Sequence, residues 1–144
     1  MKLPKPRKII AEKYIAGLSL FKSRRSPIKL SANESALGPS PKAVKSYNSI
    51  GKGFVRYPDS DGTFFRKVLA KQFNLNKDRI ILGSGSDQIF ELVCKLFLNK
   101  GDEVVVTQYS FIIYRIYSRM CGATVKFAKE ENFTPSVQSI LDCV

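Results

Sequence analysis

Residues 80–97, IILGSGSDQIFELVCKLF, decide the fold class, because a short apolar run leads directly into glycines and then into a helical pattern. Residues 79–82 predict a buried β-strand, since the run is short, apolar and bounded by a glycine-rich turn. Glycines at 83 and 85 allow a sharp turn and a close approach of the backbone to a ligand. The helix that follows is predicted by apolar residues on one face, which are Ile89, Phe90, Val93, Leu96 and Phe97.

Strands and helices alternate beyond this unit. Helices are predicted around residues 41–47, 64–73 and 111–120, and strands at 104–106 and 124–127. Thr134 is a candidate N-cap, with Pro135 at the first position of a further helix. Such alternation is typical of an α/β fold in which a sheet lies between helix layers.

The N-terminal part of the chain is less patterned. Ile28 and Leu30 alternate with polar neighbours, which predicts a short extended segment. Before them the chain is basic, and one apolar face of a short helix or arm is predicted from Ile9, Ile10, Tyr14, Ile15 and Leu18.

The turn at residues 83–87 is a candidate anion site. Ser86 and Asp87 lie where the helix begins, and the free N–H groups and positive dipole end of a helix favour a phosphate there. The pattern GSGSD matches neither the dinucleotide fingerprint nor the P-loop. The alternative is a structural turn in which Ser86 is the N-cap and Asp87 complements the helix dipole. Because the Asp87 carboxylate would repel a phosphate, the backbone N–H groups and the Ser86 hydroxyl should make the contact.

Composition excludes several classes of protein. The chain has 144 residues, which is enough for one small domain, and no apolar run approaches the roughly 18 residues that span a bilayer. Residues 1–7 are basic but no apolar stretch follows, so a secretory signal is not predicted. Cys94, Cys121 and Cys143 are odd in number and unpaired in spacing, and the chain has no His. We therefore expect free thiols, no metal site and a cytoplasmic location.

The net charge of +12 raises the alternative of a basic nucleic-acid-binding module. Its support is the cluster Lys22, Arg24 and Arg25. The other basic residues are scattered, and no helix-turn-helix, zinc-finger or RNP-like motif is present. The sequence therefore disfavours nucleic acid as a partner.

Four segments, in chain order, resemble the N-terminal part of histidinol-phosphate aminotransferases, which are fold-type I pyridoxal-phosphate enzymes. They are KLSANESALGPSPKAV at 29–44, RYPDSDGTFFRKVLAKQF at 56–73, DRIILGSGSDQIFELV at 78–93 and YSFIIYRIYSRMCGA at 109–123. The resemblance implies a partial three-layer α/β sandwich of the large domain, preceded by an N-terminal arm. Residues 1–54 would form the arm and the segment after it, and residues 55–144 the incomplete first part of the cofactor-binding domain.

The resemblance also implies roles for individual residues. Ser86 and Asp87 match the pair whose turn holds the cofactor phosphate, and Phe111 matches the aromatic residue that stacks on the pyridoxal ring. Tyr57 matches a tyrosine that reaches the neighbouring subunit's cofactor phosphate in a homodimer. Asn33, followed by Glu34, matches a pair near the substrate. The plainer alternatives are a core residue at a helix start for Phe111, a packed turn for Tyr57 and a solvated turn for Asn33.

Some positions depart from the family pattern. Residues 35–37 replace the usual proline-containing stretch, Gln88 stands where Glu is common, and Gln108 precedes the aromatic segment. The family's Schiff-base Lys, the Asp that pairs with the pyridine nitrogen and the Arg that binds the substrate carboxylate all lie downstream of the matched segments. We therefore expect no catalytic residue in this chain, which would be a split gene product, a remnant or a cut piece.

The intact family moves an amino group between glutamate and a phosphorylated amino alcohol, with pyridoxal 5'-phosphate as cofactor. A second polypeptide with the missing C-terminal part would be needed for activity. The alternatives are a fragment of another small aminotransferase or of a threonine-phosphate decarboxylase-like enzyme, and a non-catalytic remnant.

Overall fold

Residues 103–128 form a β-α-β unit, and all of the buried residues of the described part of the chain lie in it. The computed structural model describes residues 9, 12–14, 28, 30 and 32–144. Strand β1 (Glu103–Thr107) leads into helix α4 (Ile112–Cys121), which returns the chain to strand β2 (Thr124–Ala128). The buried residues are Val106, Ile113, Ser118, Ala123 and Ala128.

The two strands pair in parallel, with Glu103 opposite Thr124 and Thr107 opposite Ala128. Parallel neighbours need a crossover connection, which α4 provides. The helix ends at Gly122, whose φ of 87° lies in the left-handed region that favours glycine. The predicted strands at 104–106 and 124–127 and the predicted helix at 111–120 are confirmed.

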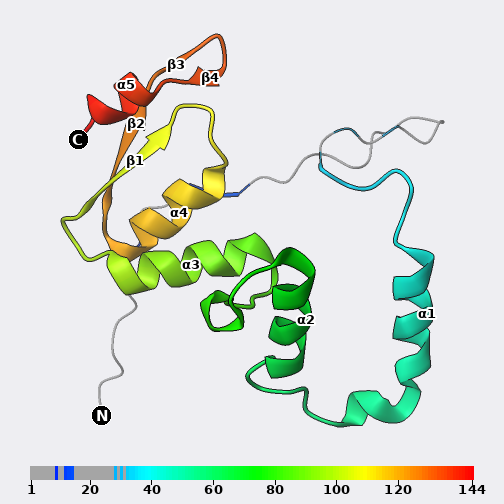
Figure 1. The fold of residues 1–144 in the computed structure, drawn as a ribbon. Helices are drawn as coiled ribbons and strands as arrows, with labels where there is room; N and C mark the ends of the chain where they lie inside the picture. Colours follow the sequence, from blue (N-terminus) through cyan, green and yellow to red (C-terminus); the bar gives the residue numbers. More distant parts are fainter. Residues whose placement is uncertain (1–8, 10–11, 15–27, 29, 31) are drawn as a thin grey trace, which may run out of the picture. The chain divides into compact units, whose positions relative to one another are not determined.

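The sheet is covered on both faces (Figure 1). On one face, Arg115 of α4 lies over the ring of Phe127. On the other face, the Lys126 ammonium donates to the carbonyl of Cys143, just after helix α5 (Val137–Leu141), at 3.1 Å. A helix layer on each face of a parallel sheet is the α/β arrangement that the sequence predicts.

Helix α3 (Gly85–Phe97) is also confirmed, and it packs on α4 (Figure 1). The predicted strand at residues 79–82 is wrong. A 3-10 turn, η2 (Lys77–Arg79), occupies the start of that segment, and the side chain of Ile81 is 75% exposed. A strand needs a ladder partner, and in the described part of the chain β1 and β2 pair only with each other.

A second correction concerns Thr134. It lies with Pro135 in strand β4 (Thr134–Pro135), which pairs with β3 (Glu130–Glu131) in a short antiparallel hairpin that the sequence did not predict. The cap of α5 is instead Ser136, whose hydroxyl accepts from the backbone N–H of Ser139 at 3.3 Å. The helix therefore begins two residues later than predicted, because the hairpin holds Thr134 in an extended conformation.

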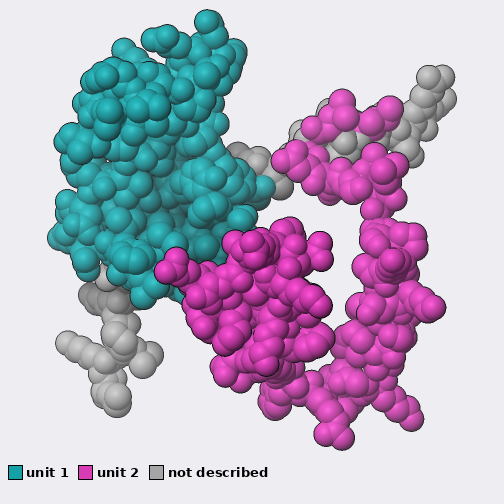
Figure 2. Space-filling model, viewed as in Figure 1, with its two compact units in different colours: residues 1–14, 83–144 teal, residues 15–82 magenta. Residues whose placement is uncertain are grey.

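The chain divides into two compact units, residues 1–14 with 83–144 and residues 15–82, coloured teal and magenta in Figure 2. The second unit contains α1 (Pro41–Ile50), the 3-10 turn η1 (Gly51–Val55) and α2 (Thr63–Phe73), which confirms the helices predicted at 41–47 and 64–73. Most of the predicted N-terminal apolar face, and the basic cluster at 22–25, lie outside the described residues.

Candidate functional site

The N-terminal end of α3 presents unpaired backbone donors. In the described structure, the N–H groups of Ser86 and Asp87 have no protein acceptor, whereas the N–H of Gly85 donates to the carbonyl of Gly83 at 2.9 Å. The first N–H groups of a helix have no partner within the helix, and together with the helix dipole they attract an anion. The residues from 83 to 88 are exposed, so this end of the helix is open to a ligand.

Two glycines shape this turn. Gly85 has φ +76°, a left-handed conformation that a side chain would strain. A Cβ atom on Gly83 would lie 2.8 Å from Cδ1 of Ile89, so Gly83 allows the backbone to pass close to the helix. The turn therefore depends on both glycines for its path.

The N-cap of α3 is Ser84, so the alternative that made Ser86 the cap is wrong. The side chain of Ser84 makes no capping hydrogen bond. Instead, the amide oxygen of Gln88 accepts from the backbone N–H of Ser84 at 2.6 Å. Ser86 lies inside the first turn, where its hydroxyl and N–H are both available to a ligand. In the sequence Gln88 stands out only as a departure from a family pattern, but its hydrogen bond to Ser84 is a local contact between residues four apart, similar to a capping box.

Phe111 lies at the start of α4, as its N-cap residue, with its side chain 45% exposed. Its ring makes an edge contact with Tyr114 at 6.2 Å between centroids, and Tyr114 makes another with Phe90 of α3 at 4.7 Å. Phe90 is one helical turn after Ser86 and Asp87. Aromatic contacts thus connect Phe111 with the helix that carries the candidate anion site.

These residues fit a phosphorylated aromatic ligand. The free N–H groups of Ser86 and Asp87 suit a phosphate, and nothing lies within 4 Å of the place where a Cβ atom on Gly85 would be. Phe111, on the neighbouring helix, has exposed ring surface on which a planar ring can stack.

Tyr57 and Asn33 belong to the second unit. The side chain of Tyr57 is 101% exposed and packs on nothing in its own unit. It precedes a turn that Asp59 organises, since the carboxylate of Asp59 accepts from the backbone N–H groups of Asp61 and Phe64, both at 3.3 Å. Asn33 is exposed in a segment without regular structure, beside Glu34.

Comparison with known proteins now decides the family. The family model described as aminotransferase class I and II matches residues 25–143. The chain belongs to this family. This chain is 45% identical over 141 residues to histidinol-phosphate aminotransferase of Pelagibacter ubique, a match that covers 98% of this chain and 39% of the relative. It is 35% identical to histidinol-phosphate aminotransferase 1 of Caulobacter vibrioides, over 99% of this chain and 40% of the relative.

Solved structures agree on the fold. Histidinol-phosphate aminotransferase of Sinorhizobium meliloti, in complex with pyridoxal-5'-phosphate, matches with a TM-score of 0.74 at 19% identity, over 77% of this chain and 30% of that one. Aspartate aminotransferase of Thermotoga maritima matches with a TM-score of 0.68 at 25% identity, over 81% of this chain and 34% of that one. The chain has a partial α/β fold of the fold-type I aminotransferases, and it spans about two fifths of the length of the curated relatives it matches.

Proposed function

We propose that this chain is the N-terminal, cofactor-phosphate-binding portion of a pyridoxal-phosphate-dependent aminotransferase that acts on a phosphorylated amino alcohol with glutamate as amino donor. The observation that carries the proposal is the N-terminal end of α3, where the N–H groups of Ser86 and Asp87 are free and Phe111 is connected to the same helix through Tyr114. Similarity to histidinol-phosphate aminotransferases over almost the whole chain supports the substrate class.

In this proposal the bound cofactor supplies the electron-withdrawing ring on which amino transfer occurs. The residues of this chain bind and orient it. The backbone N–H groups of Ser86 and Asp87 and the Ser86 hydroxyl donate to the phosphate, while the Asp87 carboxylate turns aside. Phe111 stacks on one face of the ring and restricts its orientation. Asn33 is proposed to contact the substrate.

Tyr57 is proposed to reach the cofactor phosphate of a neighbouring subunit in a homodimer. Its side chain is fully exposed within its own unit, which leaves the hydroxyl available to another chain. The free state of Cys94, Cys121 and Cys143 supports a reducing, cytoplasmic setting for the proposed enzyme. As a separate finding, no helix in the described part of the chain is long and apolar enough to cross a membrane.

The Lys that binds the cofactor covalently is proposed to lie in the C-terminal part of the family's fold, on the same polypeptide or on a second one. A groove of about 450 Å³ supports this, since it lies between α3, β1 and α4 and is lined by apolar side chains that include Val93, Phe97, Val104 and Val106. In the described sheet, β1 has β2 as its partner strand, which leaves its other edge available. A strand with apolar side chains would pair with that edge and fill the groove.

The test begins with the DNA that follows the codon for Val144. A reading frame that encodes a Ser-x-x-Lys segment and a downstream Arg is expected, and the two parts are then expressed together, joined in one polypeptide or as two. The expected result is a complex that retains pyridoxal 5'-phosphate through gel filtration and transfers the amino group of glutamate. A co-expressed pair without cofactor absorbance would overturn the proposal, and the absence of such a frame would favour the non-catalytic remnant.

Variants assign the site within that complex. Ser86→Ala is expected to raise the Kd for pyridoxal 5'-phosphate about tenfold, because one hydrogen bond to a charged group is lost. Phe111→Ala is expected to raise it by a similar factor and to shift the cofactor spectrum. Ser84→Ala is the matched control, because the Ser84 side chain makes no capping hydrogen bond in the structure. Equal effects of Ser84→Ala and Ser86→Ala would contradict a specific phosphate contact.

A further inference from the structure

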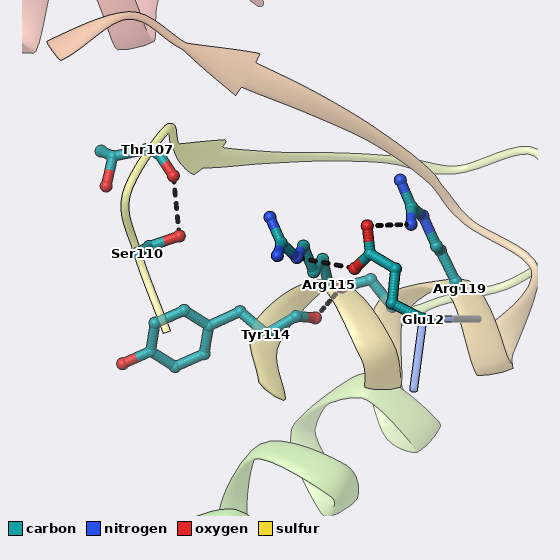
Figure 3. A network of polar contacts seen from close by, with 7 residues as sticks. Glu12, Thr107, Ser110, Tyr114, Arg115 and Arg119 are labelled. Carbon is teal, nitrogen blue, oxygen red and sulfur yellow. Dashed lines mark hydrogen bonds and ion pairs between the residues drawn. The ribbon is translucent and has the colours of Figure 1, made fainter. Parts of the chain in front are cut away.

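An ion-pair clamp joins the N-terminal arm to α4. The carboxylate of Glu12 lies between Arg115, with Oε2 to Nε 2.7 Å, and Arg119, with Oε1 to Nη1 2.9 Å (Figure 3). The two arginines are one helical turn apart, so a single carboxylate spans both. The Arg115 N–H has no hydrogen-bond geometry in the structure, so that contact is ionic.

The arm runs antiparallel to α4 in the part of the structure that is described. Ile9 lines a hollow with Arg119, Met120 and Cys121, at the C-terminal end of the helix. Tyr14 lies at the opposite end, where its ring makes an edge contact with Phe111 at 6.4 Å between centroids. Glu12 is between them, both in sequence and along the helix. The order of contacts indicates a segment aligned along the helix rather than one isolated ion pair.

The sheet also holds the Arg115 side chain of this clamp in place. The Arg115 guanidinium lies 5.8 Å from the centre of the Phe127 ring on β2. The guanidinium is thus held between the arm carboxylate and an aromatic ring of the sheet, and the side chains of Arg115 and Arg119 are only 25% and 29% exposed. Partial burial reduces screening by solvent and salt and makes this pair stronger than a fully exposed one.

We propose that the arm is a latch, in which Glu12 clamps Arg115 and Arg119 and so holds Tyr14 against Phe111. Tyr14 and Tyr114 then each make an edge contact with the Phe111 ring, and the two contacts together fix the plane of that ring. Glu12 is a positioning residue that never touches the ligand. The inference rests on the proposed function only where it assigns Phe111 to the cofactor ring.

Release of the arm can be measured without any ligand. The full chain is labelled with 3-fluorotyrosine, and the fluorine resonance of Tyr14 is assigned by its loss in Tyr14→Phe. An aromatic neighbour shifts the fluorine resonance of a tyrosine. In the wild-type chain, the Tyr14 resonance is therefore expected at a chemical shift different from that of an unstructured tyrosine. In Glu12→Gln the Tyr14 resonance moves toward the chemical shift of an unstructured tyrosine, because loss of the charge pairing lowers the ratio of docked to released arm about fivefold.

Matched variants identify the cause of that movement. Glu131→Gln removes the same charge at an exposed residue of the same unit and is expected to leave the resonance unchanged. Glu12→Asp keeps the charge but shortens the reach, so it should release the arm only in part. A Tyr14 resonance that is the same in Glu12→Gln as in the wild type would overturn the latch, as would a wild-type resonance already at the unstructured position.

Titration of the same samples separates the latch from the proposed function. If both hold, Glu12→Gln raises the Kd for pyridoxal 5'-phosphate about fivefold and leaves the Kd for inorganic phosphate unchanged, because only the former contacts Phe111. An unchanged Kd for pyridoxal 5'-phosphate with a released arm would overturn the positioning role. If neither compound binds the wild-type chain, the proposed phosphate site fails for this chain, and the fluorine resonance still decides the latch.

Discussion

The β-α-β unit and the helices of residues 41–73 place their apolar side chains differently. In residues 103–128, Val106, Ile113, Ala123 and Ala128 are buried. In contrast, neither α1 nor α2 contains a buried residue, and the exposed side chains there include Tyr47, Phe64 and Phe73, at 65%, 76% and 63%. Both regions form the helices that the sequence predicts, so helical periodicity alone does not produce a core.

The difference lies in what each region packs against. A crossover helix returns the chain to a parallel strand, and this closure buries one face of the helix on the sheet. Helix α2 is instead defined by local contacts, namely the carboxylate of Asp59 at its start and Asn74, with φ 52°, at its end. Each large apolar side chain left exposed forgoes about 1.5–3 kcal/mol of burial. Residues 41–73 are therefore the region that gains most from a covering partner.

The largest expected effect tests the core of the β-α-β unit. Ala128 is 1% exposed, and Ala128→Asp would bury a charge without a partner, at a cost above about 3 kcal/mol. Amide hydrogen exchange should show loss of protection across β1 and β2, with the helicity of residues 63–73 retained. Val137→Asp, at a position 74% exposed, is the control and should stay within about 0.5 kcal/mol. Loss of amide protection in the β-α-β unit and in residues 63–73 together would contradict the contrast between the two regions.

A smaller effect is expected at the turn before α3. Gly85→Ala places a side chain at φ +76° and should lower the free energy of unfolding by about 1–2 kcal/mol. Denaturant unfolding followed by circular dichroism measures this. Ser84→Ala, which removes no capping hydrogen bond, should cost less than half as much. Equal costs would mean that the glycine conformation is not what the turn requires.

The hydrogen bond of Gln88 should contribute less. Gln88→Ala removes the acceptor of the Ser84 N–H and is expected to cost about 1 kcal/mol. Gln88→Glu retains the acceptor and adds a negative charge near the helix N-terminus, so it should retain or slightly increase stability. The same charge should weaken binding of inorganic phosphate. Stronger phosphate binding in Gln88→Glu would argue against an anion site at this end of α3.

The smallest effect is expected on the exposed face of α2. Phe65 is 53% exposed, so Phe65→Ser should change the stability of this chain by no more than about 0.5 kcal/mol. The same change at Phe90, which packs on Tyr114, should cost several times more. When the C-terminal part of the fold is present, the cost of Phe65→Ser should rise if that part covers α2. A large cost in the isolated chain would show that α2 already has a core of its own.

The sequence predicted well wherever the signal is local. Apolar spacing located α3 and α4, and the apolar runs at 104–106 and 124–127 located β1 and β2. The candidate anion site followed from glycines before a helix, because free N–H groups are a property of every helix start. The N–H groups of Ser86 and Asp87 are free, but the roles of Ser86, Asp87, Phe111, Tyr57 and Asn33 stay predictions.

Only the tertiary structure decided the remaining features, and the reason is physical. A run such as residues 79–82 becomes a strand only when another strand supplies a hydrogen-bonding edge, which no pattern within the run can specify. Likewise, Arg115 and Arg119 predict a charged helix face. The chain contains 12 acidic residues, however, and no local pattern indicates that Glu12 is the one that pairs with these arginines. The sequence by itself determined the family, the order of the elements from α3 to β2 and the glycine turn before α3. The tertiary structure decided which edges are paired, which apolar faces are covered and which carboxylate holds the arm, because these depend on contacts between residues far apart in the chain.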